Sequence, residues 1–184
     1  MMKKYASILM MLILSSFGAM PQDWVSITSN PQMPTTISTT RSTSSQVKFT
    51  VFLPGFVSKM KSEGTKLFQR VSLSEQMLTG ETGTPNIPTI FQLVAIPEYS
   101  QITYSVQVLS SQMLTGYALY PIPERGERHE DGLSYVEEAY ALNAAAYAQN
   151  TNLPGTYYQV METGYIRSQK FIRPELYPMQ CNPA

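Results

Sequence analysis

The chain has 184 residues, with 13 Lys and Arg against 13 Asp and Glu, and therefore a formal net charge of zero at pH 7. Charged residues make up only 14% of it and form no basic stripe, which excludes the electrostatic surface typical of nucleic-acid-binding proteins. Cys181 is the only cysteine, so a disulfide within the chain is excluded and stability must come from packing.

Residues 1–18 have the pattern of a secretory signal peptide. Lys3 and Lys4 precede an apolar run over residues 6–14, and the small residues after it predict cleavage between Gly18 and Ala19. That run is too short to span a bilayer, and no later segment approaches the roughly 20 apolar residues of a transmembrane helix. We therefore expect an exported chain, periplasmic, cell-surface or extracellular, without a membrane span after signal removal. A retained amino-terminal anchor is the alternative.

The next segment, residues 19–46, is rich in Ser, Thr and Pro, above all from Asn30 to Gln46. Such a composition buries too little apolar surface to offset the entropy of ordering, which predicts a flexible linker. Order is expected to begin at Val47–Phe52, where apolar and polar residues alternate with the period of a half-buried strand. The mature chain of about 165 residues then holds one domain, residues 47–184.

Short apolar or alternating segments follow, separated by Gly and Pro turns. They are Lys66–Leu73, Ile90–Ile96, Ile102–Leu109, Tyr117–Ile122, Thr156–Met161, Gly164–Gln169 and Phe171–Tyr177. This succession predicts a mainly all-β domain, an antiparallel β-sandwich. Leu133–Gln149 departs from the pattern, because its alanines and glutamates favour a helix, which we expect to cross between two groups of strands.

The residues available for catalysis are few. His129 is the only histidine, and it lies in a polar, turn-rich stretch, whereas the only thiol, Cys181, lies near the end of the chain. A cysteine nucleophile needs a held base and an orienting third group, so we expect no enzyme activity. Zinc would need three or four suitable ligands, and the acidic residues at 124–131 alternate with arginines and lack EF-hand spacing. We therefore expect no metal and no cofactor.

Several short motifs stand in a fixed order along the chain. They are Gly83-Thr84-Pro85-Asn86-Ile87-Pro88, Val94-Ala95-Ile96-Pro97, Gly164-Tyr165-Ile166-Arg167 and Pro178-Met179-Gln180-Cys181-Asn182-Pro183, with Leu53-Pro54-Gly55 and Pro154-Gly155 at consistent places. Each is weak alone. Their order and spacing, over roughly Phe49 to Pro183, resemble the amino-terminal propeptide of gingipain-type secreted cysteine endopeptidases, peptidase family C25.

The resemblance implies a non-catalytic β-sandwich that folds ahead of its protease, assists its folding and blocks its active site until cleaved. The partner would be a gingipain-like catalytic domain, in cis or in trans. In the resembled proteases that prefer arginine, a propeptide loop places a basic side chain in the specificity pocket, where a carboxylate grips a guanidinium. Arg125 and Arg128, in the predicted loop Ile122–Gly132, are the candidates, and the sequence leaves the choice between them open. An ordinary hydrated loop is the alternative.

Two features depart from the family pattern. Cys181 stands where the family signature has tyrosine, and the chain stops at Ala184, where family members continue with another strand and a caspase-like domain. The domain is therefore expected to be truncated at its C-terminus, with an exposed sheet edge. The alternative function is a stand-alone exported β-sandwich that binds a surface partner, which the twelve tyrosines would suit. A downstream in-frame His-Gly and cysteine motif would distinguish the two.

Overall fold

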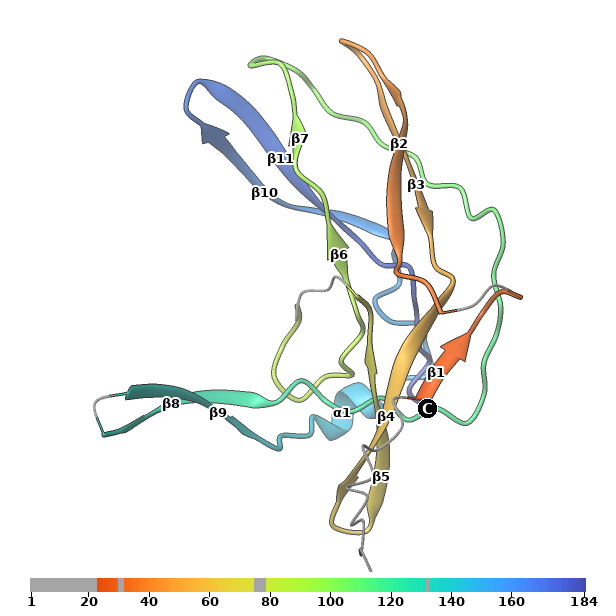
Figure 1. Cartoon of the computed structure of the whole chain (residues 1–184), viewed down its shortest axis with the longest axis vertical. Helices are drawn as coiled ribbons and strands as arrows, with labels where there is room; N and C mark the ends of the chain where they lie inside the picture. The colour runs from red at the N-terminus through yellow and green to blue at the C-terminus, as the bar shows by residue number, and fades with distance from the viewer. Residues whose placement is uncertain (1–22, 30–31, 75–78, 132) are drawn as a thin grey trace, which may run out of the picture.

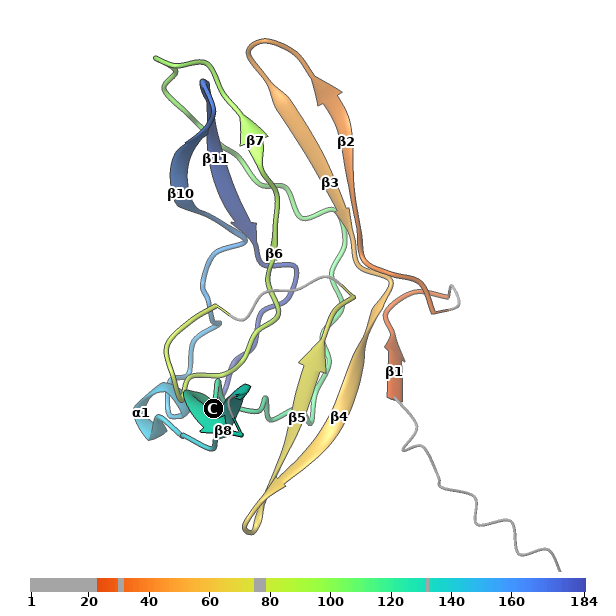
Figure 2. The ribbon, with the colours of Figure 1, turned by 60° about the vertical axis from the view of Figure 1, so that its left-hand side comes forward.

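The computed structural model describes residues 23–29, 32–74, 79–131 and 133–184. Within them lie eleven strands and one short helix. The larger sheets form two facing layers, and one hairpin, β8–β9, stands away from them (Figures 1 and 2). The elements are β1 Asp23–Ser26, β2 Thr36–Ser42, β3 Val47–Phe52, β4 Gly55–Glu63, β5 Lys66–Ser72, β6 Ile90–Phe91, β7 Val94–Ala95, β8 Glu124–Glu130, β9 Leu133–Ala139, α1 Ala144–Tyr147, β10 Tyr158–Ile166 and β11 Gln169–Leu176.

All the strand ladders are antiparallel. One sheet has the order β1-β4-β5, and the ribbon β2–β3 continues it, because β3 runs into β4 across Leu53-Pro54. The other sheet has the order β10-β11-β6, with β7 also paired to β11. The hairpin β8–β9 forms a two-stranded sheet of its own. Figure 2 shows the two larger sheets on opposite sides of the molecule, which confirms the predicted mainly antiparallel β-sandwich.

The core lies between these two sheets. Its centre is a cluster of Phe56, Val71, Leu73 and Ile90, each no more than 8% exposed. Partly buried apolar residues from both layers pack against it, including Val25, Ile37, Val51, Leu119, Leu176 and Met179. Burial of apolar surface between the sheets is thus the main contribution to stability, as expected for a chain without disulfides.

The predicted linker is wrong over part of its length. Two stretches of residues 19–46 are strands, because β1 pairs with β4 and β2 pairs with β3. Threonine suits a half-buried strand, and the β2–β3 hairpin supplies a local partner that composition alone does not reveal. The expected signal peptide and its cleavage site at Gly18 and Ala19 lie outside the described residues.

The predicted helix Leu133–Gln149 is also wrong for most of its length. Leu133–Ala139 is strand β9, and only Ala144–Tyr147 is helical, with the Asn143 side chain accepting a hydrogen bond from the amide of Ala146 at 3.1 Å. Asp131, at φ 50°, turns the chain back so that β9 pairs with β8 along its whole length. That pairing overrides the weak helix preference of alanine and glutamate.

Other strands differ in extent from their predictions. Thr156–Met161 and Gly164–Gln169 belong largely to one strand, β10, whose register shifts between Val160 and Glu162. Ile90–Ile96 is divided into β6 and β7, and within Tyr117–Ile122 only isolated bridges form, at Leu119 and Pro121. Ile102–Leu109 is not part of any strand.

We expect the free energy of unfolding to fall between pH 10 and pH 12. Burial, followed by the hydrogen bond that its hydroxyl donates to Glu63 at 2.8 Å, raises the pKa of Tyr120 from 10.0 to about 12, and burial and Glu175 do the same for Tyr177. A phenol that binds its proton more tightly in the folded chain stabilises the fold below its unfolded pKa, and this contribution is lost as the pH rises through its folded pKa.

Urea denaturation at a series of pH values measures this dependence. Tyr120→Phe should make the decrease between pH 10 and 12 shallower. Tyr99→Phe, which changes a ring that is 95% exposed, is the matched control and should leave the slope unchanged. An identical slope in Tyr120→Phe and the wild type would contradict the assignment.

Candidate functional site

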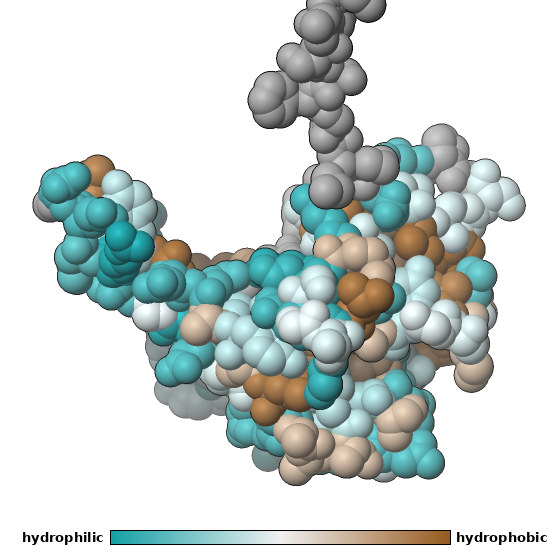
Figure 3. All heavy atoms as spheres, turned by 90° about the horizontal axis from the view of Figure 1, so that it is seen from below, coloured by the Kyte–Doolittle hydropathy of each residue, from teal (hydrophilic) through white to brown (hydrophobic). Residues whose placement is uncertain are grey.

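The β8–β9 hairpin is the most exposed element of the described structure. All residues of both strands are exposed. Figure 1 shows the hairpin standing away from the body, and the hydropathy colours of Figure 3 show this arm to be mostly hydrophilic. Its register runs from Glu124 opposite Ala139 to Glu130 opposite Leu133. The segment that the sequence predicted as a loop is therefore a strand, and Arg125 and Arg128 both lie on β8.

Strand geometry separates the two arginines. Successive side chains of a strand point to opposite faces, so Arg128 shares a face with Glu130, and Arg125 shares the other with Glu127 and His129. Arg128 is opposite Tyr135 in the third residue pair from the turn, whereas Arg125 is opposite Glu138 near the base. The two guanidinium groups thus occupy different places on the arm.

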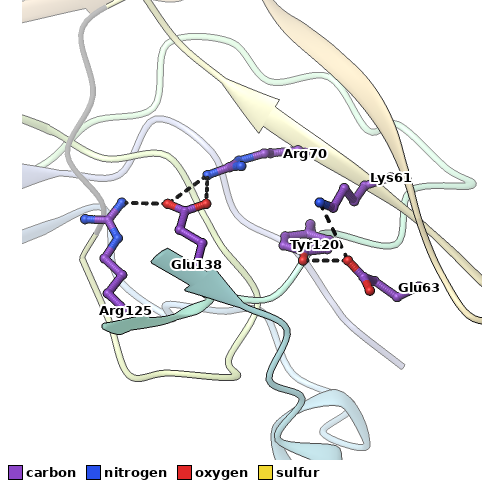
Figure 4. A network of polar contacts seen from close by, with 6 residues as sticks. All are labelled: Lys61, Glu63, Arg70, Tyr120, Arg125 and Glu138. Carbon is purple, nitrogen blue, oxygen red and sulfur yellow. Dashed lines mark hydrogen bonds and ion pairs between the residues drawn. The ribbon is translucent and has the colours of Figure 1, made fainter. Parts of the chain in front are cut away.

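An ion-pair network holds Arg125 at the base of the hairpin. The Glu138 carboxylate accepts hydrogen bonds from Nη2 of Arg125 at 3.2 Å and from Nη2 of Arg70, on β5, at 3.1 Å (Figure 4). Partial burial acts to raise the pKa of Glu138, but the charges and hydrogen bonds of Arg70 and then Arg125 lower it overall. Glu138 is therefore ionised at neutral pH and links the hairpin to the β1-β4-β5 sheet.

The Gly83–Pro88 turn anchors the two chain segments that lead into and out of the hairpin. The Gly83 amide donates to the carbonyl of Ile122 at 2.8 Å, just before β8, and the Gly83 carbonyl accepts from the amide of Asn143 at 2.9 Å, after β9. Gly83 has φ +85°, and a Cβ there would lie 2.8 Å from the Asn143 nitrogen. Only glycine fits this conformation and this close approach.

Aromatic packing adds to the anchorage. Phe68 of β5 is 4% exposed, and its ring contacts Tyr120, Tyr140 and Tyr147 with centroid distances of 5.9, 6.1 and 6.2 Å. The Tyr147 hydroxyl donates to the carbonyl of Leu119 at 2.5 Å. These contacts surround the segments before β8 and after β9, so the root of the hairpin is fixed while its outer part stays in solvent.

The outer part of the arm carries Arg128. Its Nη2 is 2.7 Å from Oε2 of Glu130, and both side chains are more than half exposed. A shallow recess of about 270 Å³ beside the pair is lined by Arg128, Glu130, Tyr135, Val136 and Glu137. Because solvent-exposed ion pairs contribute little free energy, the Arg128 guanidinium can leave Glu130 for another carboxylate at small cost.

The other predicted motif residues support turns and chain segments outside the hairpin. Arg167, at φ 58°, lies in the turn between β10 and β11, and a Cβ at Gly164 would meet the Phe171 ring at 2.9 Å. Near the C-terminus, Gln180 donates to the carbonyl of Thr156 at 3.4 Å and Asn182 to the Asn150 side chain at 2.7 Å. Four prolines remain. Pro85 forms an isolated β-bridge with Pro121, and Pro88 is fully buried. The carbonyl of Pro97 accepts a hydrogen bond from the amide of Ser100, and Pro183 is partly exposed.

The structure gives Cys181 and His129 separate settings. The backbone of Cys181 pairs with that of Leu153 at 2.8 and 3.0 Å, and burial raises the pKa of the thiol to about 11. The thiol is therefore protonated at neutral pH and is a poor nucleophile. His129 is exposed on the hairpin, 3.8 Å from Glu127. Among the described residues no group of three or more His, Cys, Asp or Glu is placed to hold a metal ion.

In the described part of the chain, no helix has the length and apolar character needed to cross a membrane. No curated protein matches the chain. A structure from work on the zymogenic latency of gingipain K from Porphyromonas gingivalis is similar, with a TM-score of 0.68 and 20% identity over 87% of this chain and 88% of that one. The complex of Porphyromonas gingivalis RgpB pro- and mature domains gives a TM-score of 0.57 and 17% identity over 84% and 77%. These likenesses show a shared fold.

Comparison of the amino-acid sequence with models of protein families identifies the family of this chain. The model of the Propeptide_C25 family matches residues 24–184, which include both sheets, the hairpin and all the motifs after the linker. The fold, the turn that anchors the hairpin and the protonated Cys181 are consistent with a non-catalytic propeptide domain. This chain belongs to the Propeptide_C25 family.

Proposed function

We propose that this chain is the propeptide domain of a secreted gingipain-like cysteine endopeptidase and that it blocks the active site with the outer part of the β8–β9 hairpin. The observation that carries the proposal is the hairpin itself, exposed along both strands yet fixed at its root. The partner is the mature catalytic domain, in cis or in trans, by analogy with the complex of the RgpB pro- and mature domains. The domain also assists folding of that partner.

Within the hairpin we assign Arg128, rather than Arg125, as the residue that enters the specificity pocket of the partner protease. Arg125 shares Glu138 with Arg70, so withdrawing it would weaken the base of the hairpin. Arg128 would exchange one exposed ion pair for a contact with a pocket carboxylate, in which a guanidinium can donate two parallel hydrogen bonds. Shielding from water makes the new contact stronger than the exposed one it replaces.

Export belongs to the same proposal. The amino-terminal pattern supports removal of residues 1–18 by cleavage between Gly18 and Ala19. The mature domain would then meet its protease in the periplasm, at the cell surface or outside the cell. A neutral chain without a basic stripe gives no support for a nucleic-acid partner.

The direct experiment adds the purified domain to a mature gingipain-type protease that cleaves after arginine and measures hydrolysis of a short peptide substrate. Inhibition that rises with domain concentration is expected. If the folded domain does not inhibit even when its concentration is many times that of the protease, the proposal is contradicted. The alternative function, a surface-binding module, would then be favoured.

We expect Glu138→Gln to weaken inhibition by about 1.4- to fivefold, because loss of one partly exposed ionic link removes roughly 0.2–1 kcal/mol. The substitution takes away the charge that joins Arg125 to Arg70 and leaves the outer part of the hairpin unchanged. Glu124→Gln, at the same end of the hairpin but opposite Ala139, is the matched control. Inhibition constants and hydrogen exchange of the hairpin amides measure the effect. Equal behaviour of the two variants would show that the ionic link does not position the hairpin.

A further inference from the structure

The longest uncharged stretch of the chain is also its most exposed connection. Residues 99–123 contain no Asp, Glu, Lys or Arg. Within them, residues 101–115 belong to no strand or helix and run as a drawn-out trace along the outside of the molecule (Figures 1 and 2). All of these residues except the half-buried Leu114 are exposed, with Leu109 at 75% and Met113 at 89%.

The structure holds this segment at both ends. Before it, the Ser100 amide donates to the carbonyl of Pro97 at 3.2 Å. After it, Gln69 on β5 holds the chain with three hydrogen bonds. Its side-chain oxygen accepts from the amide of Ala118 at 2.6 Å. Its amide donates to the carbonyl of Ala118 at 2.8 Å, and its carbonyl accepts from the amide of Tyr120 at 2.9 Å. Between these anchors the half-buried Leu114 packs against the core cluster, and the Tyr104 ring contacts that of Tyr158 at a centroid distance of 4.2 Å. No backbone group of residues 101–115 is hydrogen-bonded to another residue that the structure describes.

Such a segment suits the binding mode of proteases. A protease binds its substrate as an added extended strand, so a residue within a β-ladder must first be freed by local unfolding. In residues 101–115 no ladder has to open. The residues there that could occupy the primary specificity pocket are large and apolar, foremost Leu109 and Met113, because the whole interval between Arg70 and Arg125 lacks Lys and Arg.

Basic residues are placed differently. The described part of the chain has eleven Lys and Arg, of which ten lie on strands, and the remaining one, Arg167, lies in the turn between β10 and β11. A protease that cleaves after Lys or Arg therefore meets its target bonds in paired strands or a tight turn. A protease that accepts a large apolar residue meets an unpaired segment.

We propose that residues 101–115 are the primary cleavage site of this domain, used by proteases that take a large apolar residue before the cleaved bond. Hydrolysis adds one water across the peptide bond and leaves a new carboxylate on the fragment with β1–β7 and a new amine on the fragment with β8–β11. The Arg70–Glu138 ion pair would then join two separate polypeptides. This consequence rests on the proposed function: a second protease, different from the inhibited one, would end the inhibition by making this cut.

Limited digestion of the folded chain with chymotrypsin, with fragments mapped by mass spectrometry, tests the site. The first cut should fall within residues 101–115. A first cut at Leu133 or Tyr135, which are exposed but paired in β9, or at any other strand residue would overturn the proposal. This cleavage map is independent of inhibition, so a domain that is cut as expected but does not inhibit would refute the proposed function alone.

A matched pair of variants isolates the role of strand pairing. Met113→Arg creates a trypsin site in the unpaired segment, and Met60→Arg creates one in β4, where Met60 is 58% exposed and pairs with Gln69. Trypsin should cut after residue 113 at least about tenfold faster than after residue 60, because β4 must open locally before cleavage. Similar rates would overturn the proposal. Circular dichroism checks that both variants fold. If Met113→Arg does not fold, Leu109→Arg takes its place.

Discussion

Arg128→Ala should weaken inhibition of an arginine-preferring gingipain-type protease by roughly one to three powers of ten, since each 1.4 kcal/mol corresponds to a factor of ten. In the proposed complex the Arg128 guanidinium meets a pocket carboxylate from which water is excluded. Removing the guanidinium leaves that carboxylate buried without a partner, which costs far more than losing an exposed ion pair. In the free domain, Arg128→Ala removes one ion pair among the described residues, that with Glu130.

Two further variants separate the effect from general damage to the hairpin. Arg128→Lys keeps the charge but not the planar pair of donors, so its inhibition constant should lie between those of wild type and Arg128→Ala. Arg125→Ala should cause a smaller loss, close to that of Glu138→Gln, because both remove part of the same ionic link. Inhibition constants for all four proteins, measured with one substrate, decide the matter. Equal potency in wild type and Arg128→Ala would remove Arg128 from the mechanism.

Phe56→Ala should lower the free energy of unfolding by about 3–5 kcal/mol, the usual range for removing a buried phenylalanine ring. Phe56 is 1% exposed, lies at the centre of the core cluster, and meets the Tyr117 ring edge-on at a centroid distance of 5.8 Å. Such a loss is a large fraction of the roughly 5–15 kcal/mol that stabilises a typical domain. The variant should therefore unfold at much lower urea concentration and inhibit only while folded.

Phe52→Ala is the control for this prediction. Phe52 ends the adjoining strand β3 and is 40% exposed, so its removal should cost less than half as much as that of Phe56. Urea denaturation followed by circular dichroism gives both values. Similar losses in the two variants would show that the contact between the two sheets is not the main stabilising core.

Local patterns predicted the sandwich well. Alternation in Val47–Phe52 and the apolar residues of Lys66–Leu73 indicated strands, and both segments are strands in the structure. The errors arose where pairing with a distant or facing strand decides the conformation. β1 is ordered by pairing with β4, and Ile102–Leu109 has strand composition but no strand beside it.

The candidate site was predicted in part. Arg125 and Arg128 were named from the sequence, but their placement in a loop was wrong, and the Asp131-Gly132 pair was the signal that could have indicated a hairpin. The link from Glu138 to Arg70 joins residues 68 positions apart, so no local pattern reveals it. Only the fold shows that Arg125 is held at the base and Arg128 is not.

Competition with substrate tests the central proposal most directly. If the hairpin occupies the active site, the folded domain and a short peptide substrate exclude each other, so the apparent inhibition constant should rise in proportion to substrate concentration above KM while kcat stays unchanged. The domain should also protect the catalytic cysteine of the protease from a small alkylating reagent. Inhibition that does not depend on substrate concentration, or a cysteine that is alkylated at the same rate with and without bound domain, would contradict the account.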